Sequence, residues 1–358
     1  MDVRERKRKV SEARQPFVIG GQTVDPGTQR IVEIPVSVMS DNTPVSISAV
    51  VIHGKRPGPT VFVSSAVHGD EVLGVEIIRR LLRSGRVSRI AGTLIAVPIV
   101  NTFGFIAHSR YLPDRRDLNR TFPGSERGSL AARLAYLFFN EIVLRCEFGI
   151  DLHTAAIHRF NLPQVRVSPG SERAVALARA FGAPVTIVSP VREGSLRGSA
   201  EQRGVDMLLY EGGEGLRFDE LAIRAGVSGC LRVFRELGMI PERSVSLARN
   251  PTLLSTSSRW LRAPAGGIVR SMNAMGSAVN VGDTVATIAD PFGDSEQEVM
   301  ADVSGIVIGR SNLPVVNEGD ALVHVARVDG TTAHAEKRVE NVTEQLESDP
   351  LFDEDEII

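Results

Sequence analysis

The sequence predicts an α/β fold, in which helices flank a mixed, largely parallel sheet and a small all-β region follows. Three observations lead to this prediction. Strand-like and helix-like segments alternate between residues 61 and 238, which is the order that builds a parallel sheet. Near Trp260 this alternation gives way to short strands separated by glycine turns, with no helical period. The chain has 358 residues, which is enough for one large domain and one small domain.

The first half of the chain begins with strands and reaches a helix after residue 70. Strands are expected at residues 31–38 and 45–52, with a turn at 40–44 between them. A strand at 61–67 leads into a helix at 72–82 with apolar residues at helical spacing, and a buried strand follows at 92–100. Residues 101–128 read as a loop, and a loop of that length inside a compact domain is usually functional.

The second half continues the alternation up to residue 238. Ser129 is a plausible N-cap for the helix that follows it. The expected elements are a helix at 129–143, strands at 148–153 and 163–167, a helix at 171–181, a strand at 183–188, a helix at 196–204, a strand at 206–210 and a long amphipathic helix at 219–238.

Four parts are expected along the chain: a basic tail at 1–15, the α/β domain at 16–258, a β-rich domain at 259–329 and a tail at 330–358. The last part is acidic and poor in aromatic residues, so we expect it to be disordered. The β-rich domain contains an internal repeat and resembles the barrel-sandwich hybrid of biotinyl and lipoyl domains. The segment 290–296 between its halves holds no lysine, so a packing module or a lid over the site is expected rather than a carrier arm.

Composition and charge narrow the class of protein. The formal net charge of −2 provides no basic field for nucleic acid. Cys146 and Cys230 do not have metal-site spacing and read as reduced thiols of a cytosolic protein. The sequence has no apolar run long enough to span a membrane, and the charged N-terminus is not followed by the apolar stretch of a secretory signal. We therefore expect a cytoplasmic protein whose partner is a small molecule; the sequence leaves a homo-oligomer open.

Histidines and a carboxylate stand at the ends of two expected strands. His68 and Glu71 follow the strand at 61–67, and His153 ends the strand at 148–153. The carboxyl ends of strands are where open α/β sheets place their active sites. Two histidines and one carboxylate leave the fourth position of Zn²⁺ open for water, which is the catalytic arrangement. Asp151 can hydrogen-bond a ligand imidazole. The alternative for each residue is a solvated helix start or a hydrogen-bonded core histidine.

Arginines in the loop at 101–128 suggest how an anionic substrate would be held. Asn119 and Arg120 lie in this loop, and arginine clamps a carboxylate through two parallel hydrogen bonds. Arg110 can polarise a carbonyl and stabilise its oxyanion beside a metal. Arg197 is a further candidate anchor for a carboxylate. The alternative for all of them is an arginine in contact with solvent.

Four motifs occur in a fixed order: His68-Gly-Asp-Glu71, Asp117-Leu-Asn119-Arg120-x-Phe-Pro-Gly, Asp151-Leu-His153 and Glu211-Gly-Gly. Together they resemble the aspartoacylase/succinylglutamate desuccinylase family of carboxypeptidase A-like zinc deacylases. The resemblance implies a carboxypeptidase-like sheet, so that the domain at 16–258 is the zinc hydrolase domain. It implies one Zn²⁺ per chain held by His68, Glu71 and His153.

The same resemblance implies the roles of the remaining site residues. Asn119 and Arg120 would contact the substrate, and Arg110 would polarise the carbonyl. The general base of the family maps to Glu211, although Glu214, three residues further on, is a second candidate. The expected activity is removal of an acyl group from an N-acylated amino acid or a related small amide. A zinc carboxypeptidase acting on peptides and a catalytically inactive, ligand-binding member of the fold are the alternatives.

Overall fold

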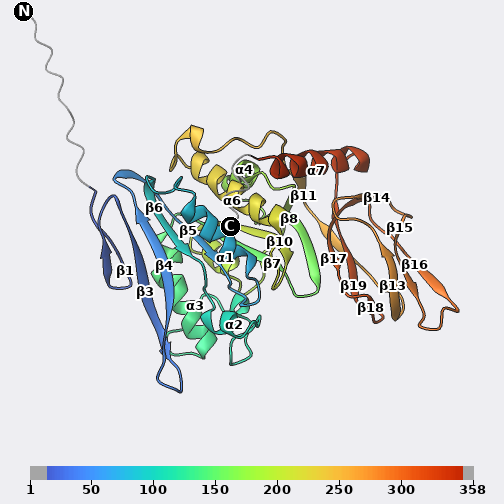
Figure 1. Cartoon of the computed structure of the whole chain (residues 1–358), viewed down its shortest axis with the longest axis horizontal. Coiled ribbons are helices and arrows are strands. Elements are labelled where there is room, and N and C mark those ends of the chain that lie inside the picture. Colours follow the sequence, from blue (N-terminus) through green and yellow to red (C-terminus); the bar gives the residue numbers. More distant parts are fainter. Residues whose placement is uncertain (1–13, 350–358) are drawn as a thin grey trace, which may run out of the picture.

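The computed structural model describes residues 14–349, which form one elongated body with helices on both faces of a central sheet (Figure 1). Thirteen strands of this part of the chain join the sheet. Its main path runs in the order β12 (Ser258–Arg262), β19 (Ala321–Arg327), β17 (Gly305–Ser311), β8 (Arg159–Val167), β10 (Asp206–Glu214), β7 (Phe148–Ala155), β5 (Arg56–Ser65), β6 (Ala91–Val97), β4 (Pro44–His53) and β3 (Thr28–Val38). Off this path, β9 (Val185–Val188) pairs with β8 and β11 (Leu253–Ser255), and β14 (Ala278–Val279) pairs with β17.

The centre of the sheet is parallel, and both of its ends are antiparallel. Strands β6, β5, β7 and β10 run parallel to one another, whereas β3, β4, β8, β17, β19 and β12 enter through antiparallel pairs. In the register of the central strands, Ser65 lies opposite Leu152, and His153 lies opposite Glu211. The carboxyl ends of β5, β7 and β10 therefore meet at one edge, as the sequence predicts.

Each face of the sheet carries its own hydrophobic core. Successive side chains of a strand point to opposite faces, so Val63 packs with one core and Phe62 with the other. The helices that cover the first face are α1 (Leu73–Arg83), α4 (Glu172–Phe181) and α6 (Glu220–Glu236), and those that cover the second are α3 (Leu130–Glu141) and α5 (Leu196–Glu201). The predicted mixed α/β fold is confirmed.

The local predictions hold for most elements, and some boundaries differ. Ser129 caps α3 by accepting the backbone N–H of Ala132, as expected. The segment 101–128 is not entirely a loop, because it contains α2 (Thr102–Ile106) and the 3₁₀ turn η1 (Leu118–Arg120). Strand β10 continues to Glu214 instead of ending at residue 210. The remaining short elements are β1 (Phe17–Ile19), β2 (Gln22–Val24), η2 (Val143–Arg145) and η3 (Glu242–Ser244).

The β-rich C-terminal region is joined directly to the large sheet. Strand β17 pairs with the first residues of β8, where Gly309 lies opposite Asn161. Strands β12, β14 and β19 continue from β17, while β16 (Glu296–Met300), β15 (Thr284–Ala289), β13 (Gly267–Met272) and β18 (Val315–Val316) form a second, antiparallel sheet. The predicted domain boundary between residues 258 and 259 falls inside strand β12. This boundary stays a prediction.

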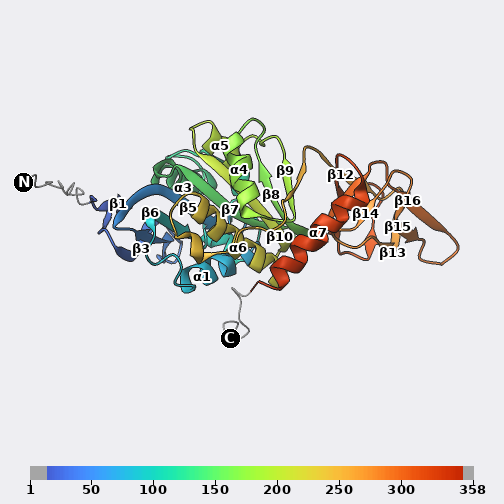
Figure 2. The same ribbon diagram turned by 90° about the horizontal axis from the view of Figure 1, so that it is seen from above.

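The expectation that residues 330–358 are disordered is wrong for the part that the structure describes. Helix α7 (Thr332–Glu347) lies across the strands of the C-terminal region and reaches α6 (Figure 2). Its buried residues Ala335, Val339, Val342 and Leu346 recur every three or four positions, so they form one apolar stripe. The helix was not predicted because the acidic composition of the segment was given more weight than the spacing of its apolar residues. Residues 350–358 lie outside the described part.

The expected basic tail at 1–15 falls almost wholly on residues outside the described part. Of its described residues, Arg14 donates hydrogen bonds to the carbonyls of Gly54 and Gly92 and to the hydroxyl of Thr93. Between residues 14 and 349, no helix has the length and apolar character needed to cross a membrane.

Candidate metal centre and active site

The turn after β5 brings His68 and Glu71 to the edge of the sheet. Ala66 has a φ of 51°, a left-handed conformation that is uncommon outside glycine and is often found at functional sites. Residue 69 must be glycine, because a Cβ there would collide with the backbone of Gly104 at the adjacent helix α2. The backbone N–H of Glu71 then donates to the carbonyl of His68 and closes the turn. The local backbone therefore fixes the spacing of the two side chains.

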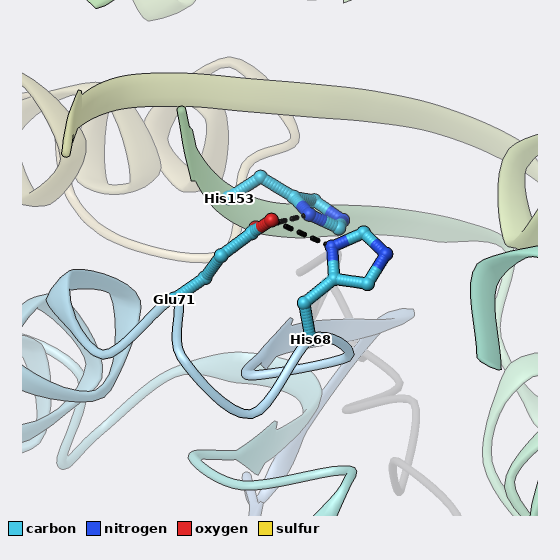
Figure 3. A group of neighbouring side chains, drawn as sticks. All are labelled: His68, Glu71 and His153. Carbon is cyan, nitrogen blue, oxygen red and sulfur yellow. Dashed lines mark hydrogen bonds and ion pairs between the residues drawn. The ribbon is translucent and has the colours of Figure 1, made fainter. Parts of the chain in front are cut away.

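His68, Glu71 and His153 converge on one point at the edge of the sheet (Figure 3). The carboxylate of Glu71 lies between the two rings, with Oε1 2.6 Å from Nδ1 of His68 and Oε2 2.6 Å from Nδ1 of His153. One ligand atom from each of the three residues lies within 4.8 Å of the others, and all three residues are buried. The backbone N–H of Thr154 also donates to Glu71 Oε2.

A second carboxylate holds each ring from behind. Nε2 of His153 lies 2.7 Å from Asp151 Oδ2, and Nε2 of His68 lies 3.1 Å from Asp117 Oδ1. Asp151 in turn accepts a hydrogen bond from the hydroxyl of Ser64. A carboxylate that accepts the outer N–H of a histidine fixes the tautomer and the orientation of the ring, so that the inner nitrogen can bind a metal. The predicted supporting role of Asp151 fits this geometry, and Asp117 has the same relation to His68.

The close packing of charged groups around Glu71 shifts the pKa values of Glu71 and His153. Burial alone would raise the pKa of Glu71, but the facing imidazoles of His68 and His153 hold that pKa well below its usual range. Burial likewise opposes protonation of His153, yet the carboxylates of Asp151 and Glu71 raise its pKa well above the ordinary value. The carboxylate of Glu71 is therefore stabilised in its ionised form between the two rings.

The donor set fits a zinc ion. Two imidazole nitrogens and a carboxylate are ligands that Zn²⁺ accepts at a catalytic site, where the remaining position is open. A metal ligand must be deprotonated, and the Nδ1 atom of each ring is the nitrogen that faces Glu71. His68, Glu71 and His153 would hold the ion, and Asp117 and Asp151 would support them.

A cavity of about 560 Å³ opens in front of the three residues. Arg110, Asn119, Arg120, Arg197 and Glu211 line it, so the structure brings together every residue that the sequence predicted for the site. The loop residues reach it through η1 and the segment before it, while Arg197 comes from α5 and Glu211 from β10.

Glu211 and Glu214 point to different places. Glu211 lines the cavity, where Oε2 accepts a hydrogen bond from Asn161 and Oε1 lies 3.3 Å from Nε of Arg166. Glu214 is not among the cavity residues, and its two oxygens accept hydrogen bonds from the backbone N–H of His158 and the side chain of Asn312. Of the two candidate bases, the geometry therefore favours Glu211.

The predicted polar residues are held by specific partners. Arg110 donates to Glu71 at 3.2 Å and to Asp117 at 3.0 Å, so its guanidinium lies directly beside the three convergent side chains. Oδ1 of Asn119 accepts the backbone N–H of Leu196, which leaves the amide nitrogen for a ligand. Arg120 donates to the carbonyl of Asn119 and is exposed to the cavity.

The family is decided by a match to residues 57–237, which cover just over half of the chain. The matching family model describes the succinylglutamate desuccinylase/aspartoacylase catalytic domain. The chain belongs to the succinylglutamate desuccinylase/aspartoacylase family. The matched segment runs from β5 to the end of α6 and contains the four motifs.

Individual relatives and solved structures extend the likeness to most of the chain. An N-alpha-acetyl-L-2,4-diaminobutyric acid deacetylase of Halomonas elongata is 27% identical over 284 residues, covering 76% of this chain and 83% of the relative. A succinylglutamate desuccinylase/aspartoacylase from Rhodobacter sphaeroides has a TM-score of 0.74 at 26% identity, covering 84% of this chain and 96% of that one. A product-bound ectoine utilization protein from Ruegeria pomeroyi, with a TM-score of 0.76 at 23% identity over 88% of this chain and 98% of its own, shows the shared fold.

Several residues that line the cavity lie outside the family motifs and were not predicted. Asn161 and Arg166 come from β8, and Trp260 and His324 come from the C-terminal strands β12 and β19. The rings of Trp260 and His324 are stacked, with centroids 4.6 Å apart. The alternation of polar and apolar residues along 159–167 was the available signal for β8. No local signal marks Trp260 and His324, because only the docking of β17 on β8 brings them to the cavity.

Proposed function

We propose that this chain is a zinc-dependent amidohydrolase that removes an acyl group from an N-acylated amino acid or a related small amide. The observation that carries the proposal is the convergence of His68, Glu71 and His153 in a cavity that Glu211 also lines. Membership of the family and the names of the relatives, a deacetylase and desuccinylases, support cleavage of an amide bond.

Zinc bound in this site would lower the pKa of water towards ~7 and act as a Lewis acid for the amide carbonyl. Glu211 then takes the proton of the water whose oxygen bonds to the carbonyl carbon. Arg110 stabilises the negative charge that develops on the carbonyl oxygen. When the carbon–nitrogen bond breaks, Glu211 returns its proton to the departing amine, and the acyl group leaves as a carboxylic acid.

Asn119 and Arg120 hold the substrate in this mechanism. The amide nitrogen of Asn119 and the guanidinium of Arg120 both line the cavity, and both are donors suited to a carboxylate. Arg197 supplies a third donor group from α5. A small anionic substrate is the expected partner, because several arginines line the cavity.

The test is to measure metal content and hydrolysis on the same purified protein. We expect close to one zinc per chain by elemental analysis, and release of free amine from at least one member of a panel of N-acetyl and N-succinyl amino acids. Protein that holds no stoichiometric zinc and stays inert after zinc is added back would refute the proposal. Release of C-terminal residues from peptides, without deacylation of the panel, would instead identify a carboxypeptidase.

A further inference from the structure

Helix α7 links the C-terminal strands to helix α6 on the large sheet (Figure 2). Near its start, the carboxylate of Glu336 accepts the backbone N–H of Ala278 in strand β14, and the helix packs against β17. In its second half, Val342 and Leu346 are buried in the hydrophobic core that α6 also shares. The helix therefore crosses the joint between the two regions and is attached on both sides of it.

A buried ion pair fixes the far end of this helix. Asp349 lies just beyond α7, and its Oδ2 accepts a hydrogen bond from the hydroxyl of Ser228. The same oxygen is 3.7 Å from Nη2 of Arg232, and both partners belong to α6. Arg232 is only 2% exposed. Since a buried cation that loses its anion is strongly destabilising, this pair holds the end of α7 on α6.

Alternation along strand β19 places α7 and the wall of the cavity on one face of the strand. Val323 and Val325 belong to the core of the C-terminal region. The residues that alternate with them, His324 and Ala326, therefore point to the opposite face. Ala326 joins a buried cluster with Val339 of α7, whereas His324 lines the cavity. The helix and the cavity thus meet the same face of β19.

The buried cluster around Val339 also bridges the joint itself. Leu162 of β8 and Ile308 of β17 are members of it. The two strands pair only along residues 159–161 of β8, which is a short ladder. Because buried side chains are closely packed and deform little, the cluster fixes how the C-terminal strands lie against β8.

We propose that α7 is a strap and that Val339 is a positioning residue, which holds Trp260 and His324 in the wall of the cavity. Val339 acts through the strands, since it is not among the residues that line the cavity. Loosening the strap displaces this wall and leaves the three convergent side chains of the metal centre in place. A wall that contacts substrate and transition state alike affects KM rather than kcat. The kinetic part of this inference rests on the proposed function.

The test adds a charge to the buried side of the strap in the full-length protein. Val339→Asp puts a carboxylate into an apolar cluster, which should detach α7 from the joint. Ala333→Asp adds the same charge on the exposed side of the same helix and is the matched control. On an N-acyl amino acid that the native protein cleaves, we expect Val339→Asp to raise KM about 10-fold and to change kcat by less than about 3-fold. Ala333→Asp should keep both native values.

Fluorescence measures the position of the wall without any substrate, because Trp260 is the only tryptophan of the chain. Its indole is stacked on His324, with ring centroids 4.6 Å apart, and the guanidinium carbon of Arg159 lies 5.3 Å from the centroid of the indole. Val339→Asp should shift the emission to longer wavelength and make acrylamide quench it more strongly, since the displaced indole is more exposed to water. Ala333→Asp should keep the native spectrum.

Asp349→Asn loosens the other end of the strap and should change both readouts in the same direction, by a smaller amount. It decides the matter if circular dichroism shows that Val339→Asp does not fold. Native Trp260 emission in the folded variants would overturn the inference. So would a native KM in a variant whose emission is shifted, because the wall would then not contact the substrate. If the native protein cleaves no amide while Val339→Asp still shifts the emission, the proposed function fails and the strap stands.

Discussion

The side-chain amide of Asn161 donates a 2.6 Å hydrogen bond to Oε2 of Glu211. Asn161 lies on β8 and Glu211 on the neighbouring antiparallel strand β10, so the contact joins two strands of the sheet. Glu211 is thereby held by a neutral donor on one oxygen and by the Arg166 ion pair on the other. A base held in this way meets its substrate in one orientation.

Replacing Glu211 by Gln should remove turnover and leave zinc bound, because Gln cannot take a proton from water and Glu211 is not one of the three ligands. Asn161→Leu should lower kcat by about 10-fold with little change in KM, since it leaves the base less constrained. Steady-state kinetics and zinc content, measured on each purified variant, test the predictions for Glu211→Gln and Asn161→Leu. Glu214→Gln is the control and should stay active; an inactive Glu214→Gln beside an active Glu211→Gln would reverse the assignment of the base.

His153→Ala should abolish zinc retention through dialysis, because it removes one of three ligands. Asp151→Asn keeps the ligand and alters only its support, so zinc affinity should fall by about 10- to 100-fold. Competition with a chromogenic chelator measures both effects. An Asp151→Asn protein with native zinc affinity would show that the 2.7 Å contact to His153 is not needed to hold the ion.

Arg110→Gln should lower kcat by about 10²- to 10³-fold, the usual effect of removing one donor to an oxyanion. Because Arg110 also contacts Glu71 and Asp117, zinc content must be measured on the same sample. Arg116→Gln is the matched control, because it removes an exposed arginine of the same loop. A zinc-loaded Arg110→Gln with native kcat would exclude Arg110 from the chemical step.

His324 should make folding sensitive to acid. Its pKa is lowered by burial and by Arg166 to about 3 in the folded state, while in the unfolded chain it stays near 6.5. Below pH 6.5 the unfolded state binds one more proton, so the folding equilibrium should weaken by about tenfold per pH unit down to about pH 3. Denaturant unfolding between pH 7 and pH 5 measures this slope, and His324→Gln should make it shallower. Identical slopes would mean that other groups control acid stability.

Leu346→Ala should lower the free energy of unfolding by about 2–4 kcal/mol, because the side chain is 1% exposed and its removal leaves a cavity under α7. Glu344→Ala, on the exposed side of the same helix, should stay within about 0.5 kcal/mol of the native protein. Urea unfolding measures both. If the two variants were equally stable, α7 would not be packed on the core as described.

Local sequence predicted the parts of the site that are built locally. His68, Glu71 and His153 could be found because each follows a strand whose apolar run is visible, and parallel strands end at one edge. Asn161 was missed because the strand was expected only at 163–167, although the alternation of polar and apolar residues begins at 159. Arg166 lies inside the expected strand and was missed because it belongs to none of the four motifs. Trp260 and His324 depend on the pairing of β17 with β8, which no short stretch specifies. Helix α7 was missed because its period was overlooked in favour of its acidic composition.

The pairing of β17 with β8 has a consequence for shortened versions of the protein. Strand β17 covers the edge of β8 at residues 159–161, which lie opposite Ser311, Arg310 and Gly309. A chain that stopped at residue 258 would expose these backbone groups as an open strand edge, which tends to recruit strands from other copies. Such a truncation should aggregate rather than yield a smaller catalyst, because the C-terminal strands cover a strand edge of the large sheet.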